Sequence, residues 1–304
     1  MYPKTNQINE GKIMSLTRSY LFVPGTNKDM IKKAVASDAD CIIIDLEDAV
    51  ALAEKEKARE TVKESLIRFS KEKEIFVRIN DCETSFWEED LICAVLNGAA
   101  GIVVPKSESE QDIRLVCQKI REVATDLSST FQVIPLIETA KGVQFAYAIA
   151  AGDEMISKLA FGSIDFSLDI GCELSANGME LLFARSQIVI ASRAADIGAP
   201  IDTVYADFNN EAGFENEAKI AKQLGFKGKL IIHPKQIQIT HQLFSPSEEE
   251  IYNARAIVKA FEEAEANGMA SIAVNNQMVD YPVYKKAKRL LFYSNYQEES
   301  SILK

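Results

Sequence analysis

The chain has 304 residues, 47% of them hydrophobic and 26% charged, so it is long enough to bury a large core and lies near the upper limit for a single domain. The formal net charge of −11 argues against nucleic acid as a partner, because phosphate binding requires a basic field. A small anionic substrate stays open, since one local arginine can outweigh the net charge.

The sequence shows few signs of a metal-rich or membrane-bound protein. Two histidines, His233 and His241, are too few for a histidine-rich site, so any metal would be held by oxygen ligands. No apolar run of about 18 residues marks a transmembrane helix, and residues 1–17 lack a signal-peptide segment and are predicted to be a flexible leader. Five cysteines without C-x-x-C spacing are expected to be reduced thiols in a cytoplasmic protein: Cys41, Cys82, Cys93, Cys117 and Cys172.

Short apolar runs alternate with amphipathic segments along the chain. Runs that are apolar throughout are typical of strands buried on both faces, as in parallel sheets. Eight such runs with helical patterns between them predict an α/β fold, a (β/α)8 TIM barrel over residues 18–244. A doubly wound open sheet is the alternative, because periodicity does not show closure. The predicted strands are 20–23, 41–45, 75–79, 101–105, 132–138, 158–162, 202–206 and 229–233.

Helical patterns separate the strands. Residues 54–72 carry an apolar stripe at helical spacing. Residues 107–127 form a second such segment, for which Ser107 is the predicted N-cap. A third, 210–226, is predicted to stop at Gly225.

The pattern changes after the eighth strand. One long helix is predicted over 245–268, with Ser245 or Ser247 as its cap and Gly268 as its stop, followed by a loop or short hairpin and a last helix. Because the barrel is complete before this tail, residues 245–304 are expected to cover the active site or to exchange with a neighbouring subunit.

Catalytic groups of such barrels come from the carboxyl ends of the strands. Here those ends form a ring of carboxylates with one arginine and one lysine, which would raise one another's pKa values without compensation. A hard divalent cation removes the problem, and Mg²⁺ prefers few carboxylates, several waters and an anionic substrate ligand. Glu138 and Asp165, on adjacent strands, are the predicted direct ligands, whereas a helix cap or salt bridge is the alternative for each acid alone. The other ionisable strand-end residues are Asp45, Glu47, Asp48, Arg78, Asp81, Lys106 and His233.

Arg78 is flanked by apolar residues in "FVRIN" and must direct its guanidinium toward polar partners. One interpretation is a structural ion pair with Asp45 or Glu47. The other is a planar fork for a substrate carboxylate, which arginine suits better than lysine. Both can hold at once.

Two further strand ends leave alternatives open. Gly162 and Ser163, next to Asp165, fit either a backbone close to a bound anion or a plain tight turn. His233, in "IIHPKQ", fits either a general base or a structural hydrogen bond to a neighbouring loop.

Eight segments, in order, resemble the citrate lyase β-subunit-like family. This family belongs to the HpcH/HpaI aldolase group, which includes malyl-CoA, citramalyl-CoA and citryl-CoA lyases. The resemblance covers residues 18 to about 291. The segments are "RSYLFVPGTN", "DLEDAV", "VRIN", "VPKSES", "IPLIETAKGV", "AFGSIDFSLDIG", "IIHPKQ" and "QMVDYPVYKKAKRLL".

The resemblance implies a TIM barrel that carries out Mg²⁺-dependent, reversible, Claisen-type cleavage of acyl-CoA esters. It places the metal ligands on Glu138 and Asp165 and the carboxylate-binding arginine on Arg78. Asp280, in the "MVD-P" motif, corresponds to the catalytic acid/base supplied by a neighbouring subunit, which implies a homo-oligomer, either a trimer or a hexamer. Glu47 is expected to assist catalysis by holding metal-bound water or orienting Arg78.

The resemblance also implies contacts to substrate. The CoA-contacting positions correspond to Phe22 and Lys33. Gly162 is predicted to bind substrate as well, from its position beside Asp165 and not from the resemblance. The chain departs from the family at Asn27, where arginine is frequent, so phosphate contacts there are not expected by analogy.

The predicted function is cleavage of a β-hydroxyacyl-CoA, such as citramalyl-, malyl- or citryl-CoA, into an acyl-CoA and an α-keto acid. Alternatives are a citrate lyase β subunit acting on an acyl-carrier-protein thioester, a class II pyruvate aldolase acting on free hydroxy-keto acids, and an inactive regulatory paralogue. The aldolase is disfavoured, because its histidine base early in the barrel has no counterpart before His233.

Overall fold

The structure, a computed structural model, describes residues 17–124, 130–274 and 277–302. The chain divides into two compact units, Met1–His241 and Gln242–Lys304. The predicted leader, residues 1–17, lies outside the described residues except for Thr17.

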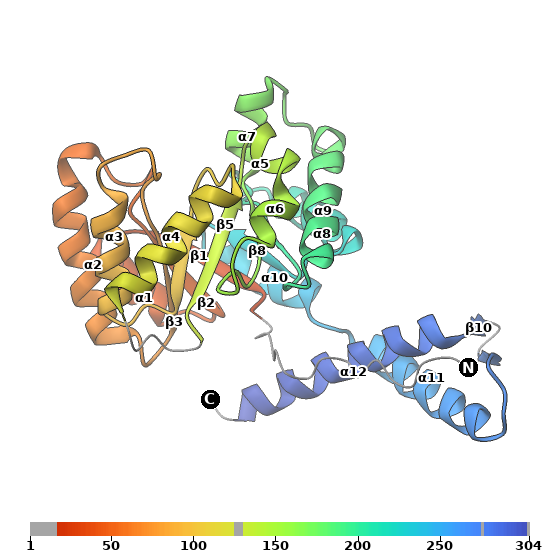
Figure 1. The fold of residues 1–304 in the computed structure, drawn as a ribbon. Helices are drawn as coiled ribbons and strands as arrows, with labels where there is room; N and C mark the ends of the chain where they lie inside the picture. The colour runs from red at the N-terminus through yellow and green to blue at the C-terminus, as the bar shows by residue number, and fades with distance from the viewer. Residues whose placement is uncertain (1–16, 125–129, 275–276, 303–304) are drawn as a thin grey trace. The chain divides into compact units, whose positions relative to one another are not determined.

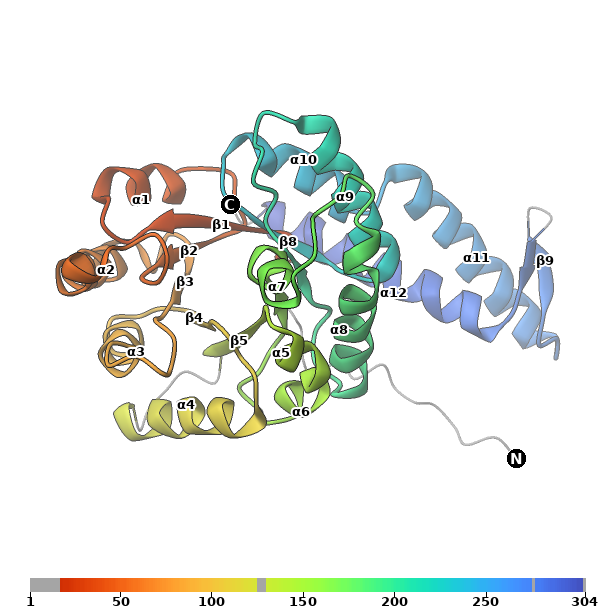
Figure 2. The same ribbon diagram turned by 90° about the horizontal axis from the view of Figure 1, so that it is seen from above.

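The first unit is a closed barrel of eight parallel strands in sequence order, in which β8 pairs with β1. This confirms the TIM-barrel prediction and rules out the open sheet. Helices α1 to α4 lie outside strands β1 to β5 (Figures 1 and 2). The strands are β1 Ser19–Pro24, β2 Cys41–Asp45, β3 Glu74–Arg78, β4 Gly101–Val104, β5 Gln132–Ile137, β6 Ala160–Phe161, β7 Ile201–Asp202 and β8 Gly228–Ile231.

The barrel interior follows from strand alternation. In β2, Cys41 and Ile43 belong to the central cluster with Phe76 and Val103 from the next two strands. Ile42 is equally buried but on the opposite face, because successive side chains alternate across a strand. Burial on both faces explains why these runs are apolar throughout.

The helices of the barrel agree with the predicted pattern, with one correction. Ser109, not Ser107, caps α4, since its hydroxyl accepts from the backbone N–H of Asp112, whereas the Ser107 hydroxyl donates to the carbonyl of Val104. Gly225 ends α9 as predicted. The helices are α1 Lys28–Val35, α2 Lys55–Phe69, α3 Trp87–Leu96, α4 Glu110–Val123, α5 Ala140–Gln144, α6 Ala146–Ala150, α7 Ser163–Ile170, α8 Leu182–Ala194, α9 Glu211–Leu224 and α10 Lys235–Phe244, with short 3-10 turns at Leu52–Glu54 and Met179–Leu181.

The second unit is a helical hairpin with a small β-hairpin at the turn. Ser247 caps the first helix in a reciprocal capping box with Glu250, and Gly268 follows the helix end at φ +77°, as the sequence predicts. Phe261 stacks on Tyr284 with ring centroids 4.7 Å apart. The elements are α11 Glu248–Ala266, β9 Ile272–Val274, β10 Gln277–Val279 and α12 Tyr281–Ile302.

Two sequence expectations concern the whole chain. All five cysteines are free thiols. Within the described residues, no helix is both long and apolar enough to cross a membrane.

Candidate active site at the carboxyl end of the barrel

Strand register brings Arg78 beside Asp45. The two residues are paired at the carboxyl ends of β3 and β2. Nε and Nη2 of Arg78 donate to the two carboxylate oxygens of Asp45, each at 2.7 Å, and both side chains are buried. The ion pair is therefore present, and this edge of the arginine fork is occupied by the protein's own carboxylate.

The remaining nitrogen of Arg78 faces two more acids. Nη1 lies 2.9 Å from Oε2 of Glu47 and 3.2 Å from Oδ2 of Asp48. The guanidinium carbon lies 5.1 Å from the ring centre of Phe22, which supports it by a cation–π contact. Burial by itself would lower the pKa of Arg78, but the hydrogen bonds and charge of Asp45, together with Glu47 and Asp48, raise it.

Glu47 is a buried acid with an unused acceptor. Oε1 accepts from Nζ of Lys106 at 3.3 Å, whereas the buried Oε2, although close to Arg78, makes no hydrogen bond of acceptable geometry. Burial, with a smaller contribution from Asp48, raises the pKa of Glu47 to about 7. The loop that carries Glu47 is held by buried Lys55, whose Nζ donates to the carbonyls of Leu46 and Glu47 at 2.7 and 2.6 Å.

Glu138, at the end of β5, is the most strongly perturbed carboxyl at the mouth. Oε1 accepts from the backbone N–H of Lys106 at 2.8 Å. Burial and the charges of Glu47 and Asp165 raise its pKa to about 8. A Cβ at Gly162 would lie only 2.6 Å from Oε2 of Glu138. Glu138 therefore occupies the space that a side chain at position 162 would need. Neither interpretation of the sequence gave this reason for the glycine.

Asp165 lies in the first turn of α7 and is half-buried. The start of this helix is fixed by Thr203 from the end of β7, whose Oγ1 accepts from the backbone N–H of Ser163 at 2.8 Å and lies 2.9 Å from its hydroxyl. Thr203 and Ser163 are both buried. Asp165 is therefore carried by a helix, and not by a strand as the sequence predicts, and this contact ties that helix to the end of β7.

The donor set fits a hard divalent cation. The charges of Asp165 and Glu47 raise the pKa of Glu138, so the three acids are close, and the buried Oε2 of Glu47, which faces Arg78, makes no hydrogen bond. Among the described residues, no three Asp, Glu, His or Cys side chains converge closely enough to form a metal cage. Two carboxylates with the other positions left to water and substrate is the arrangement that Mg²⁺ favours.

Three other predicted residues lie in β1, in α1 and in the turn between them. Phe22 is half-buried beneath Arg78, and Lys33 is exposed on the last turn of α1. The side chain of Asn27 accepts from the backbone N–H of Met30, so it is used as the cap of α1.

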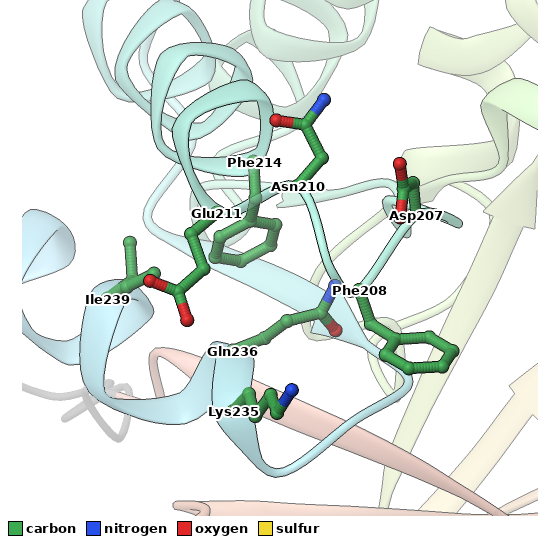
Figure 3. A pocket seen from close by; sticks show the side chains of 8 residues that line it. All are labelled: Asp207, Phe208, Asn210, Glu211, Phe214, Lys235, Gln236 and Ile239. Carbon is green, nitrogen blue, oxygen red and sulfur yellow. The ribbon is translucent and has the colours of Figure 1, made fainter.

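His233 makes structural contacts. Its ring stacks on Phe208 with centroids 4.7 Å apart, and Nδ1 accepts from the backbone N–H of Lys235 at 3.2 Å. Beside it, the first turns of α9 and α10 and the loop before α9 line a surface depression that is too narrow to hold a small molecule (Figure 3). The depression is lined by Asp207, Phe208, Asn210, Glu211, Phe214, Lys235, Gln236 and Ile239.

Asp280 belongs to the second unit. Its Oδ1 accepts from the backbone N–H of Val283 at 3.2 Å, which holds the carboxylate at the start of α12. The side chain is half-buried within that unit.

Sequence reasoning missed Lys55 and Thr203. A lysine at a helix start and a threonine after a short strand carry no motif, and only their burial shows that they support the site. Because a buried lysine is rare unless it is paired, the hydrophobic pattern of the sequence predicts that Lys55 is exposed.

Comparisons with known proteins show which family the chain is similar to. The family model described as HpcH/HpaI aldolase/citrate lyase matches residues 18–234. The chain is 40% identical over 283 residues to citrate lyase subunit beta of Haemophilus influenzae, covering 91% of this chain and 97% of that protein. It is 31% identical over 284 residues to the mitochondrial citramalyl-CoA lyase of Homo sapiens, covering 89% and 83%. A crystal structure of the protein CitE from Mycobacterium tuberculosis in complex with magnesium, acetoacetate and coenzyme A is similar with a TM-score of 0.75 and 29% identity, covering 91% of this chain and 98% of that one.

Proposed function

This chain belongs to the HpcH/HpaI aldolase/citrate lyase family, and we propose that it is a Mg²⁺-dependent carbon–carbon lyase that reversibly cleaves a β-hydroxyacyl-CoA into an acyl-CoA and an α-keto acid. Citramalyl-, malyl- and citryl-CoA are the candidate substrates. The observation that carries the proposal is the excess of buried carboxylate at the barrel mouth, where the pKa of Glu138 rises to about 8. An uncompensated acid in this position is explained by a cation that binds during function.

Glu138 and Asp165 would hold Mg²⁺, which when bound supplies a Lewis acid and a template for the carboxylate and carbonyl oxygens of the keto acid. Arg78 would bind the carboxylate of the keto acid. Since Asp45 occupies Nε and Nη2, the substrate would meet Arg78 on the Nη1 side, where Glu47 and Asp48 now lie. Asp45 keeps the guanidinium in one orientation for that contact.

Two protons move in the reaction. In cleavage, the substrate hydroxyl loses a proton as the carbon–carbon bond breaks, and Glu47, whose Oε2 faces Arg78 without a hydrogen bond, would accept it. The acyl carbon then takes a proton from Asp280 of a neighbouring subunit, and in condensation Asp280 removes it. This assignment makes the enzyme a homo-oligomer, a trimer or hexamer, in which residues 245–304 complete the site of the barrel at 18–244.

The CoA portion would enter beside β1 and α1. Phe22 borders the guanidinium of Arg78, and Lys33 is exposed for a phosphate contact. Gly162 would contribute to substrate binding by leaving room for Glu138, which a side chain at position 162 would displace.

A second candidate is a citrate lyase β subunit that acts on an acyl-carrier-protein thioester. The identity of 40% to the subunit from Haemophilus influenzae favours it. The chemistry at the mouth is the same for both candidates, because the carrier and CoA differ only beyond the thioester.

The proposal is tested by incubating the purified chain with the three CoA thioesters, with a citryl-carrier-protein thioester and with free hydroxy-keto acids, each with Mg²⁺ or with EDTA. We expect keto acid release from one thioester, and its loss in EDTA. Turnover that persists in EDTA, or cleavage of free hydroxy-keto acids alone, would contradict it. Turnover of the carrier thioester alone would select the second candidate.

Asp280→Asn should abolish this turnover while Mg²⁺ and pyruvate still bind, as measured by calorimetry. Asp196→Asn is the control, since Asp196 forms an exposed ion pair with Arg193. An Asp280→Asn protein that cleaves at the wild-type rate would reduce the tail to a packing element.

A further inference from the structure

The two cations at the barrel mouth, Arg78 and Lys106, differ in how many of their N–H donors are bound by acids. Arg78 directs Nε and Nη2 to Asp45, and Nη1 faces Glu47 and Asp48. Lys106 has one hydrogen bond from its ammonium group, to Glu47 at 3.3 Å, and a longer ion pair with Asp81 at 3.5 Å. The Lys106 side chain is 44% exposed, compared with 11% for Arg78, so it is the more accessible of the two cations to a ligand.

The backbone of Lys106 is in an unusual conformation. Its φ of +43° lies in the left-handed region, which side chains with a Cβ disfavour and glycine adopts freely. Neighbouring bonds hold it there, since its own N–H binds Glu138 and the next residue, Ser107, bonds through its N–H to Leu136 and through its hydroxyl to Val104. A lysine kept where glycine would be unstrained indicates a use for its side chain.

The position of Lys106 links it to both halves of the site. Its N–H fixes the predicted metal ligand Glu138 at 2.8 Å, and its ammonium group reaches Glu47 from the other side. The ammonium group forms ion pairs with Glu47 at 3.3 Å and with Asp81 at 3.5 Å, so two acids accompany its positive charge. A fixed, partly exposed cation beside a low-dielectric mouth is suited to an oxygen that becomes anionic during reaction.

We propose that Lys106 is a catalytic residue that donates a hydrogen bond to the thioester oxygen as that oxygen becomes an enolate. The inference rests on the proposed lyase function. In cleavage, the substrate hydroxyl loses its proton, its C–O bond becomes a carbonyl, and the broken carbon–carbon bond leaves its electron pair on the acyl fragment. That pair is delocalised onto the thioester oxygen, where Lys106 stabilises the charge without giving up its proton. The enolate carbon then takes a proton from Asp280, which yields the acyl-CoA.

Two substitutions separate the side chain from the backbone. Lys106→Met keeps the length of the stem and removes the charge, and Lys106→Gly removes the side chain while suiting the positive φ. Lys106→Arg keeps the charge. Lys119→Met is the matched control, because Lys119 on α4 forms an ion pair with Glu88 on α3.

We expect kcat for the thioester that the wild type cleaves to fall at least about 100-fold in Lys106→Met and Lys106→Gly, the loss typical of one oxyanion donor. KM, and the Kd values of Mg²⁺ and pyruvate, should change less than about 3-fold, and the unfolding midpoint of Lys106→Gly should stay unchanged or rise. Deuterium exchange into the methyl group of acetyl-CoA, followed by NMR with Mg²⁺ and oxalate present, should fall in parallel with kcat. Ethylammonium should restore activity to Lys106→Gly where tetramethylammonium at equal concentration does not, a response that a structural role would not produce.

Each other outcome is decisive. A wild type with neither cleavage nor exchange overturns the proposed function and this inference with it. An active wild type matched by Lys106→Met overturns the inference alone. A pyruvate Kd raised at least about tenfold with kcat unchanged would instead assign Lys106 to the keto acid carboxylate.

Discussion

The barrel contains two buried groups of charges that differ in balance. The wall cluster, formed by Arg185, Asp202, Glu217 and Lys229, joins the outer face of β7 and β8 to α8 and α9. Asp202 accepts from Nε of Arg185 and from Nζ of Lys229, each at 2.8 Å, and Lys229 also bonds Glu217 at 2.8 Å. Although burial by itself would raise the pKa of Asp202, Lys229 and Arg185 lower it. Two cations face two acids, and every carboxylate is paired.

The mouth cluster, formed by Asp45, Glu47, Arg78, Lys106 and Glu138, has more acids than cations. Its carboxyls at Glu47 and Glu138 have raised pKa values of about 7 and about 8. Each cluster contains one buried polar atom without a hydrogen bond among the described residues, Nη1 of Arg185 in the wall cluster and Oε2 of Glu47 in the mouth cluster. The comparison teaches that burial of charge alone does not mark a site, whereas an unpaired excess of one sign does.

The largest expected effect is on the wall cluster. Asp202→Asn leaves two buried cations with Glu217 as their one remaining shared acid, and should lower the free energy of unfolding by about 3–5 kcal/mol. Urea unfolding measures it, with Asp196→Asn as an exposed control that should change it by less than about 0.5 kcal/mol. Equal losses in the two variants would mean that the wall cluster is not a stabilising element.

Replacing an acid by its amide should stabilise the protein when it is made in the mouth cluster, whereas it destabilises the protein in the wall cluster. In the metal-free protein, the raised pKa of Glu138 means that the folded state holds a proton that the unfolded state has lost, so stability falls as pH rises from about 4.3 to about 8. Glu138→Gln removes this loss and should raise the free energy of unfolding in EDTA at pH 8 by on the order of 2–4 kcal/mol, with little change at pH 4. Unfolding across this pH range tests it, and Mg²⁺ binding should be abolished. A variant that is less stable than the wild type at pH 8 would contradict the comparison.

The pH dependence of the wall cluster has the opposite sign. Because the folded-state pKa of Asp202 is lowered, its contribution is present above its ordinary value near 4 and is lost as pH falls toward the folded-state value. Asp202→Asn should therefore flatten the acid side of the stability profile and leave the neutral side parallel to the wild type. Thermal unfolding between pH 3 and pH 7 measures this, and an unchanged acid limb would remove Asp202 as its source.

A smaller effect is expected at Gly162. The new Cβ of Gly162→Ala would meet Oε2 of Glu138 at 2.6 Å and its Cβ at 2.7 Å, so Glu138 must move. We expect a loss of about 1–3 kcal/mol of stability and a roughly tenfold weaker affinity for Mg²⁺. Gly225→Ala is the control, since it strains a φ of +120° at the end of α9 without touching the mouth. Equal Mg²⁺ affinities in the two variants would show that the space at Gly162 is not needed by the metal ligand.

Much of the site was predictable because it lies at strand ends. Asp45, Arg78 and Glu138 each follow an apolar run, and in a parallel barrel all carboxyl ends meet at one edge. What could not be predicted was which of them pair. Arg78 suited both Asp45 and a substrate, and only strand register shows that Asp45 takes two of its nitrogens.

The wall cluster left no recognisable trace in the sequence. Asp202 and Lys229 fall inside segments expected to be plain strands, "DTVYA" and "KLIIH", and their partners come from two different helices. Lys106 is similar, since nothing local distinguishes a lysine held at positive φ from one in an ordinary loop.

By itself, the sequence indicated eight strands in order, three of the helices between them, the capped tail helix and most of the acids at the barrel mouth, because periodicity and capping act over a few neighbouring residues. Only the tertiary structure decided barrel closure, the balanced charges of the wall and the unbalanced charges of the mouth. Pairing and pKa depend on burial and on partners far apart in the chain, and these exist only once the strands have taken their register.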